Sequence, residues 1–374
     1  MSTPDPLTLF LVAAPGLEPA LIAEAKAHGF GPLKPISGGV ECTGDWPDVW
    51  RANLMLRTAT RVLVRIGEFR AFHLAQLDKR ARKFPWGDVL RADQPIRVEV
   101  STNRKSKIYH AGAATQRIER AITETLGAPV SPDAKIALKV RIDDNLCTFS
   151  VDSSGESLHK RGHKVALNKA PMRETLAAAF LYQAGYRGEE PVLDPMCGSG
   201  TFVIEAAEIA RALPPGRTRE FAFEHLATFD ADAWAEMRVD WAARDVADGI
   251  VFRGSDRDAG AISIATDNAE RAGVADLTAF HHAAISDLER PDGPPGLIIV
   301  NPPYGERIGN KRALFGLYAA MGAAFRERFT GWRVGIITTD AALARATELP
   351  LLPPGPPVPH GGLKVRLFLT KPLP

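Results

Sequence analysis

A glycine-rich turn between an apolar strand and an apolar helix constrains the fold of this chain more than any other feature. The stretch 192–207 reads VLDPMCGSGTFVIEAA, and apolar strands and amphipathic helices alternate after it. The expected strands are 191–194, 250–254, 278–281, 296–301, 332–338 and 363–370, and the clearest expected helices are 172–184, 201–213, 259–272 and 312–329. This alternation predicts a doubly wound α/β domain with a parallel sheet.

The residues before this domain also alternate between strand and helix, but within smaller units. Expected strands are 7–13, 40–42, 61–66, 95–101, 135–142 and 146–152, and expected helices lie near 17–25, from 46 and over 113–125. The turn Asp143-Asp144-Asn145 separates the last two strands. The pattern predicts an α+β layer of the ferredoxin-like kind, followed by a polar linker that contains glycine.

Length and composition narrow the class of protein. A chain of 374 residues favours two or more domains, and 45% hydrophobic with 24% charged residues is typical of a soluble globular protein. The apolar runs are far shorter than the roughly 18 residues that a membrane span needs. The start has no basic region ahead of its apolar residues, which argues against a signal peptide. Three scattered cysteines, Cys42, Cys147 and Cys197, indicate a cytoplasmic protein without disulfides or a cysteine metal site.

The net charge of +2 conceals two unlike halves. Residues 1–170 hold 25 Lys and Arg against 18 Asp and Glu, whereas residues 171–374 hold 21 against 26. A basic half joined to an acidic half suggests a module for a polyanion, although basic solvated surfaces are common.

The glycine turn suits a cationic ligand better than a phosphate. Val203 stands where a dinucleotide fingerprint has its third glycine, and no lysine follows the glycines as in a phosphate-binding loop. Asp194 ends the strand, where it would repel a pyrophosphate. Asp256 ends the next strand and can accept hydrogen bonds from two ribose hydroxyls. S-adenosylmethionine, which is positively charged and carries a ribose, fits this pair. The alternative is that the glycines only form a tight turn beside exposed loop acids.

The stretch LIIVNPPYG stops an apolar strand with a stiff loop at the same edge of the sheet. Pro302 and Pro303 fix φ and lack N–H groups, so carbonyls point outward. If the Asn301 side-chain oxygen and the Pro302 carbonyl each accept an N–H of a nucleobase amine, the nitrogen lone pair turns towards a methyl donor. Tyr304 would stack on the base. Asn-Pro-Pro is also an ordinary turn that ends strands.

Four motifs together resemble class I methyltransferases that carry a THUMP domain. They are PMRETLAAAF, DPMCGSGTFVIEAA, GSDRDAGAI and NPPYGERIG, with GLEPALIAEAKAHGF and GGVECTGD near the start. The chain most resembles the bacterial family that methylates the N2 amine of a guanine in large-subunit ribosomal RNA. The resemblance implies a ferredoxin-like module over 1–66, an RNA-binding THUMP domain over 67–155, a linker over 156–171 and a Rossmann-like methyltransferase domain over 172–374.

The same resemblance assigns roles to residues. Asn301, Pro302, Pro303 and Tyr304 would hold the target amine. Glu174 and Thr175 would close over the methionine end of the cofactor. The cofactor-binding set is Glu174, Thr175, Asp194, Pro195, Gly198, Gly200, Thr201, Asp256 and Asp287. Many relatives have an acid after the third strand that binds the adenine amine. Ala284 stands there in this chain, so either a backbone group binds the adenine or the correspondence shifts to Asp287.

Three basic clusters are candidate RNA contacts, because phosphate contacts supply affinity. They comprise Lys79, Arg80, Arg82 and Lys83; Arg104, Lys105 and Lys107; and Lys160, Arg161 and Lys164. Each cluster alone is more typical of a solvated surface. His159 and His163 lack a third ligand and belong to this basic linker, so no metal site is expected. We expect RNA as the partner, no membrane, and Cys197 in a packing role.

Three other functions remain open from the sequence. The first is guanine-N2 methylation of transfer RNA, and the second is adenine-N6 methylation of a nucleic acid, since the same amine geometry serves both bases. The third is a silent RNA-binding or ribosome-assembly factor that keeps the fold, although Asn301 to Tyr304 carry no disabling change. The target nucleotide, the oligomeric state and the choice between free RNA and a precursor particle are not encoded in these motifs.

Overall fold

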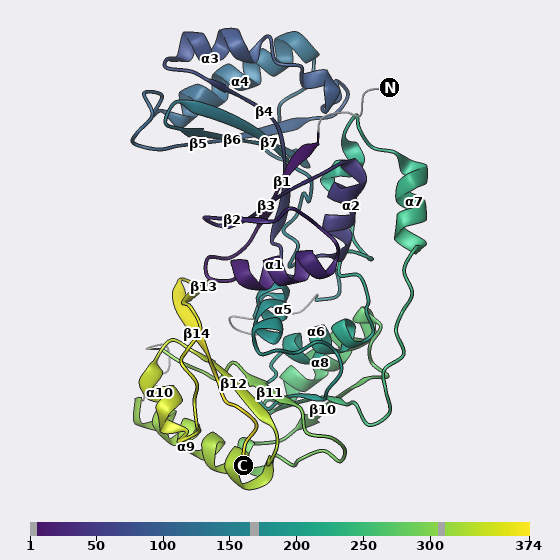
Figure 1. Cartoon of the computed structure of the whole chain (residues 1–374), viewed down its shortest axis with the longest axis vertical. Helices are drawn as coiled ribbons and strands as arrows, with labels where there is room; N and C mark the ends of the chain where they lie inside the picture. Colours follow the sequence, from purple (N-terminus) through teal and green to yellow (C-terminus); the bar gives the residue numbers. More distant parts are fainter. Residues whose placement is uncertain (1–5, 165–171, 306–310) are drawn as a thin grey trace. The chain divides into compact units, whose positions relative to one another are not determined.

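The computed structural model describes residues 6–164, 172–305 and 311–374, which fall into two compact units (Figure 1). The first unit comprises Met1–Ala13, Ile22–Leu158 and Gly216–Trp241, and the second comprises Ala14–Leu21, His159–Pro215 and Ala242–Pro374. Residues 165–171 of the expected linker and 306–309 of the NPPYGERIG motif lie outside the described residues. Within the described ranges, no helix combines the length and the apolar character that a membrane span requires.

One seven-stranded sheet runs through the whole first unit, in the order β2-β3-β1-β4-β7-β6-β5. The strands are β1 (Leu7–Val12), β2 (Lys34–Ile36), β3 (Gly39–Gly44), β4 (Arg61–Arg70), β5 (Ile96–Thr102), β6 (Ile136–Asp143) and β7 (Leu146–Asp152). Only β5 and β6 pair in parallel; the other neighbours are antiparallel. Because β4 pairs with both β1 and β7, the sheet continues across the boundary proposed at residue 66.

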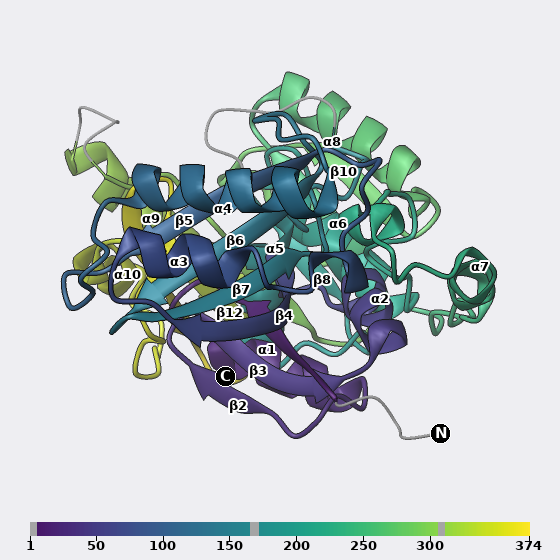
Figure 2. The same ribbon diagram turned by 90° about the horizontal axis from the view of Figure 1, so that it is seen from above.

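The helices that accompany these strands are α1 (Glu18–Ala27), α2 (Trp46–Met55), α3 (Leu74–Ala81), α4 (Ala111–Leu126) and α7 (Ala231–Val239), with short turns η1 (Trp86–Asp88) and η2 (Ala222–His225). Of these helices, α1, α2 and α4 were expected from the sequence. Figure 2 shows α3 and α4 lying over β5, β6 and β7. The helix α2 begins with a capping box in which Asp45 and Asp48 each accept the other's backbone N–H.

Residues 216–241 group with the first unit, although they lie inside the range expected for the methyltransferase domain. Aromatic packing is the reason. The Trp50 ring of α2 stacks on Phe223 at 6.1 Å between centroids, and Phe223 meets Trp234 edge-on at 5.0 Å. The Gly216 N–H also donates to the Leu54 carbonyl at 2.9 Å. Such contacts between residues far apart in sequence leave no periodic signal, so the domain boundaries stay a prediction.

The second unit contains the expected doubly wound sheet, in the order β10-β9-β8-β11-β12-β14-β13. Its elements are α5 (Glu174–Gln183), β8 (Val192–Asp194), α6 (Thr201–Ala210), β9 (Phe252–Asp256), α8 (Ala259–Ala272), β10 (Thr278–His282), η3 (Ile285–Asp287), β11 (Leu297–Val300), α9 (Lys311–Arg328), β12 (Arg333–Thr338), α10 (Ala341–Ala346), β13 (Val358–His360) and β14 (Leu363–Leu369). Strands β8 to β12 are parallel, whereas β14 and β13 add an antiparallel edge. The predicted Rossmann-like fold is confirmed, and its edge is mixed.

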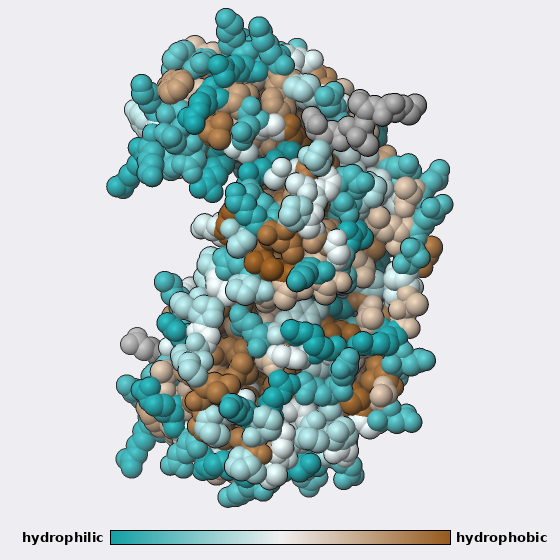
Figure 3. Space-filling model, viewed as in Figure 1, coloured by the Kyte–Doolittle hydropathy of each residue, from teal (hydrophilic) through white to brown (hydrophobic). Residues whose placement is uncertain are grey.

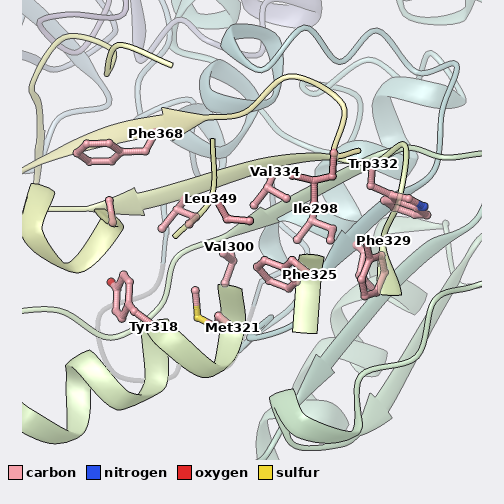
Figure 4. Close-up of a cluster of buried hydrophobic side chains, with 14 of the residues drawn as sticks. Ile298, Val300, Tyr318, Met321, Phe325, Phe329, Trp332, Val334, Leu349 and Phe368 are labelled. Carbon is pink, nitrogen blue, oxygen red and sulfur yellow. The ribbon is translucent and has the colours of Figure 1, made fainter. Parts of the chain in front are cut away.

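A packed apolar core holds β11, the strand that precedes Asn301. On α9, buried Leu314, Tyr318, Met321 and Phe325 recur every three or four residues and so share one face. Figure 4 shows Ile298 and Val300 of β11 against this face. Each fully buried side chain of this kind stabilises the fold by roughly 1.5–3 kcal/mol. The end of β11 is therefore held firmly.

Five short elements had no expectation in the sequence: β2, β13, α3, α7 and α10. The two strands have three residues each, too few to display a period. The helix α7 buries only Trp234, and α10 has six residues. Short or mostly exposed elements depend on tertiary contacts rather than on a repeating apolar pattern.

Candidate active site

The glycine turn and both expected acids meet at the carboxyl edge of the second sheet. The Asp194 side chain accepts the Met196 N–H at 3.0 Å, which starts the turn. The Asp256 side chain accepts the Gly198 N–H at 3.0 Å and the Asp258 N–H at 3.0 Å. The strands β8 and β9 are parallel neighbours, so the two carboxylates leave the sheet side by side. Asp256 is thus oriented by the turn itself.

The two glycines of the turn have different roles. Both adopt positive φ, +51° at Gly198 and +81° at Gly200. A Cβ on Gly198 would meet nothing within 4 Å, whereas one on Gly200 would lie 3.1 Å from Ala265 and Phe280. Gly198 therefore leaves open space beside a backbone that a ligand can approach, and Gly200 allows close packing of the turn on α8 and β10. Pro195 lies within the same turn.

Burial makes the ionisation of Asp194 sensitive to a positive group nearby. Asp194 is 2% exposed, and this burial raises the pKa of its carboxyl to about 8; the Met196 N–H opposes the shift and the charge of Asp256 adds to it. A positive group nearby would return the carboxyl to its ionised form. Burial also raises the pKa of the Cys197 thiol well above its ordinary value, so this side chain stays protonated and packs.

Lys164 lies inside the second unit and links two helix starts. Its Nζ donates to the Met172 carbonyl at 2.9 Å and to Thr201 Oγ1 at 2.8 Å, and lies 3.4 Å from Glu174 Oε1. The lysine and glutamate side chains are 9% and 5% exposed. Burial lowers the pKa of Lys164 and raises that of Glu174, and each charge opposes the shift of the other. The amine thus ties the first turn of α5 to the first turn of α6.

Arg161 is also buried, and it pairs with Glu205 of α6 at 3.1 Å between Nη2 and Oε1. Arg161 is 3% exposed and the Lys164 side chain is 9% exposed, and the expected contact of both residues with RNA stays a prediction. The sequence HKRGHK suggested a basic surface because three cations are adjacent. Only Lys160 of this cluster is exposed. Glu205 lies 44 residues from Arg161, and Glu174 begins the helix that follows Lys164, so no periodic pattern revealed either ion pair.

Thr175 and Asn301 each bury an oxygen that has no hydrogen-bond partner among the residues that the structure describes. Thr175 is 1% exposed, and its Oγ1 has no partner within the described ranges. The Asn301 Oδ1 is likewise shielded from solvent and unpaired there. Leaving a buried polar group unpaired costs about 1–3 kcal/mol, and unpaired groups in native proteins mark sites where a ligand can complete the bonding.

The NPPY loop follows β11 directly, and its two proline carbonyls differ in their hydrogen bonding. The hydroxyl of Tyr318, on α9, donates to the Pro303 carbonyl at 3.4 Å. No hydrogen bond from the described residues occupies the Pro302 carbonyl. Tyr304 is partly buried against the core around α9. Because β8 and β11 are neighbouring parallel strands, Asp194 and Asn301 emerge at the same edge.

Asp287 shows no link to this edge. It ends η3, is exposed, and accepts a hydrogen bond from the adjacent Ser286 at 3.0 Å. Ala284, which precedes η3, is exposed as well. None of the hydrogen bonds of the described residues connects Asp287 with the glycine turn. The adenine contact stays a prediction.

The remaining basic candidates lie at the surface of the first unit. Lys79, Arg80 and Lys83 are exposed, as are Arg104, Lys105 and Lys107. Arg82 is a partial exception, because it pairs with Asp78 at 3.0 Å and with Glu124. Two exposed aromatic residues near these clusters, Phe72 and Tyr109, were missed by the sequence reasoning. The only sequence signal for Tyr109 is that it follows the run NRKSK.

Comparison with known proteins gives two family matches. Residues 161–350 match the methyltransferase domain of RMKL-like proteins (UPF0020), and residues 8–63 match the ferredoxin-like domain of RlmL. A candidate RNA methyltransferase of Synechocystis is 32% identical over 96% of this chain and 95% of its own length. The ribosomal RNA large subunit methyltransferase K/L of Methylococcus capsulatus is 34% identical over 96% of this chain, which spans 50% of that longer protein.

A solved structure is similar along the whole chain. SMU.472, a candidate methyltransferase in complex with S-adenosylhomocysteine, covers 100% of both chains with a TM-score of 0.89 and 26% identity. S-adenosylhomocysteine is the demethylated form of S-adenosylmethionine. The buried acid Asp194, the carboxylate of Asp256 and the open space at Gly198 are compatible with a ligand of this chemistry.

Proposed function

The chain belongs to the RMKL-like methyltransferase family, whose cofactor is S-adenosylmethionine, and from this premise we propose that it methylates the exocyclic N2 amine of a guanine in large-subunit ribosomal RNA. The enzyme class is an S-adenosylmethionine-dependent RNA methyltransferase. The guanine target, the ribosomal substrate and an action in the cytoplasm are the finer parts of the proposal.

The unpaired oxygen of Asn301 carries the proposal for the target amine. An amide oxygen shielded from water and without a donor is suited to accept an N–H from a substrate. The Pro302 carbonyl is the second acceptor, while Pro303 is engaged with Tyr318. Two acceptors that bind the two N–H groups direct the lone pair of the amine nitrogen, which orients it without a strong base.

The other residues would hold the cofactor. Asp256 accepts from the ribose hydroxyls, Asp194 faces the positive charge, and Glu174 with Thr175 closes over the methionine end. S-adenosylmethionine supplies a methyl group activated by its positively charged sulfur. Tyr304 offers a ring for stacking on the target base, which must leave its helix to enter the site.

The ribosomal substrate is supported by the name of the Methylococcus relative and by the exposed cations of the first unit. Two carbonyl-type acceptors would serve the exocyclic amine of either guanine or adenine. The proposal of guanine therefore rests on the resemblance of the motifs alone. A guanine in transfer RNA and an adenine N6 amine are therefore outcomes that the experiment distinguishes.

The test is to incubate the purified protein with radiolabelled S-adenosylmethionine and unmodified total RNA, then separate the RNA by size and digest it to nucleosides. Label in large-subunit RNA as N2-methylguanosine is the expected result. Label as N6-methyladenosine, or in transfer RNA, would keep the enzyme class and overturn the proposed target.

The Asn301→Ala variant tests the role of the amide oxygen. Removal of a polar group that acts mainly in the transition state lowers kcat by about 100–1,000-fold. Calorimetric affinity for S-adenosylmethionine should stay within about twofold of the parent protein, since Asn301 does not hold the cofactor in this proposal. Full activity of the variant would refute the role of Asn301.

A further inference from the structure

Three connections meet at one end of the first sheet. The strands β4, β5 and β6 all run in the same direction, because β7 lies antiparallel between β4 and β6 and because β5 pairs in parallel with β6. The segments that follow them, 71–73, 103–110 and the turn 143–145, therefore lie at the same end of the sheet. The helices α3 and α4 begin from the first two of these segments.

The turn residue Asn145 fastens these connections together. Its carbonyl accepts the Ala71 N–H at 2.9 Å, and its side-chain oxygen accepts the Lys107 N–H at 2.8 Å. Ser106 adds a bond from its hydroxyl to the Ile142 carbonyl at 3.1 Å. Asn145 is 8% exposed, so these bonds are shielded from water. The end of the sheet is thus a rigid support rather than a set of independent loops.

Two aromatic rings stand in solvent on this support. Tyr109 is 72% exposed and Phe72 is 42% exposed, and within the described ranges no other aromatic residue is among the large hydrophobic side chains exposed to this degree. The ring of Tyr109 lies 5.5 Å from that of His110. Exposed aromatic residues on a rigid surface indicate a binding function, because burying their large apolar area against a partner is favourable.

One cation lies beside the Phe72 ring, and two more share the connection that carries Tyr109. Lys107 Nζ lies 5.7 Å from the Phe72 ring centre, and Arg104 and Lys105 are exposed on the same connection. In addition, α4 begins with Ala111, Gly112 and Ala113 and has no side-chain cap, so its first N–H groups remain available to an anion. This surface, defined by Phe72, Arg104, Lys105, Lys107 and Tyr109, is called here the aromatic end of the first sheet.

We propose that the aromatic end binds unpaired RNA nucleotides, with bases stacked on Tyr109 and Phe72 and phosphates held by the neighbouring cations. Stacking on an exposed ring requires a free base face, which a duplex does not offer away from its ends. The cations match the charge of the backbone, whereas an apolar protein partner would leave them without anionic partners. The inference rests on the proposed function in that RNA is the substrate, and it adds that the first unit selects a single-stranded segment.

The experiment compares the affinity of the full-length protein for two RNAs by fluorescence anisotropy. One probe is a single-stranded RNA of about 12 nucleotides, and the other is a blunt duplex of the same sequence. The variants are Tyr109→Ala, Phe72→Ala and the conservative Tyr109→Phe. Val239→Ala is the matched control, because Val239 is a 78% exposed apolar residue of the same unit on α7.

Tyr109→Ala and Phe72→Ala should each weaken single-strand binding about tenfold and change duplex binding by less than about twofold. Tyr109→Phe should retain the parent affinity, since the ring is kept, and Val239→Ala should have no effect. Unchanged single-strand affinity in Tyr109→Ala, or an equal loss for both probes, would overturn the proposal.

Methyl transfer is measured separately on total RNA. In Tyr109→Ala, KM for RNA should rise about tenfold while kcat at saturating RNA stays near the parent value. If the parent protein bound single strands through Tyr109 but labelled no RNA, the proposed function would fail and the binding inference would stand. If it labelled RNA and Tyr109→Ala behaved like the parent, the inference alone would fail.

Discussion

The two units place their charged side chains differently. Around the glycine turn, Lys164 with Glu174 and Arg161 with Glu205 are almost fully buried. In the first unit, pairs such as Lys135 with Glu220 are 66% and 83% exposed, and the surface in view over α3 and β5–β6 is mainly hydrophilic (Figure 3). Buried pairs fix positions, since each charge depends on its partner, whereas exposed cations remain available to a polyanion. The first unit also buries charged side chains, such as Glu24, Arg57 and Asp152, so the contrast holds between the glycine turn and the exposed basic clusters rather than between the units as a whole.

The largest effect should come from breaking a buried pair. Lys164→Met leaves the Glu174 carboxyl buried without its cation, and truncation of such a pair costs about 3–5 kcal/mol of unfolding free energy. The matched change Lys135→Met breaks an exposed pair and should cost less than about 1 kcal/mol. Urea unfolding followed by circular dichroism measures both. Equal losses in the two variants would remove the distinction between the units.

A second prediction concerns the buried acid Asp194. Burial raises its pKa to about 8 in the folded protein, whereas the pKa is near 4 in the unfolded chain. The contribution of this carboxyl to folding stability is therefore fully present below about pH 4. That contribution is lost as pH rises through about 8, where the carboxyl ionises. A cationic ligand prefers the ionised form, so cofactor affinity should instead rise by up to tenfold for each pH unit from 6 to 8.

The measurement is the dissociation constant of S-adenosylmethionine between pH 6 and 9, for the parent and for Asp194→Asn. The variant should bind more weakly and lose the part of the pH dependence that belongs to Asp194. Any ionisation of the ligand itself is common to both proteins and cancels in the ratio. Parallel profiles would show that Asp194 does not titrate in this range.

The smallest effect should come from exposed cations. Lys79→Ala with Lys83→Ala removes two exposed charges beside α3 and should weaken RNA binding a few-fold at low salt. The slope of log affinity against log salt should fall by about 0.7 for each phosphate that the variant no longer neutralises. Lys26→Ala with Lys34→Ala makes the same charge change elsewhere and is the control. The same decrease in both double variants would mean that net charge alone steers RNA to the protein.

Much of the fold, and part of the candidate site, could be predicted from local sequence patterns. The apolar strands and the helices of the second unit have clear periods, so their order was predictable. Residues that share a motif, such as Asp194 with Gly198 and Asn301 with Pro302, were found because turn chemistry fixes their spacing. The sequence predicted the same role for Gly198 and Gly200. Packing distinguishes them, because only Gly200 lies close to Ala265 and Phe280, which belong to other elements.

The cations of the HKRGHK stretch show that local sequence does not determine burial. Lys164 and Arg161 have the same local sequence character as exposed Lys160, and their burial depends on α5 and α6 closing over them. Conversely, the residue type of Tyr109 did not indicate that its side chain is 72% exposed. Burial is a property of the assembled elements, so residue type alone predicts it poorly at individual positions.

By itself, the sequence determined the two α/β-type layers, the glycine turn with its two acids, and the stiff Asn-Pro-Pro-Tyr stop, because these depend on backbone constraints and periodicity within short segments. The tertiary structure alone decided which charges are buried, which glycine faces open space, that the Asn301 side-chain oxygen finds no partner in the described part of the chain, and that three connections form one aromatic end. The physical reason is that solvation and hydrogen-bond pairing are set by neighbours from distant parts of the chain, which only folding brings together.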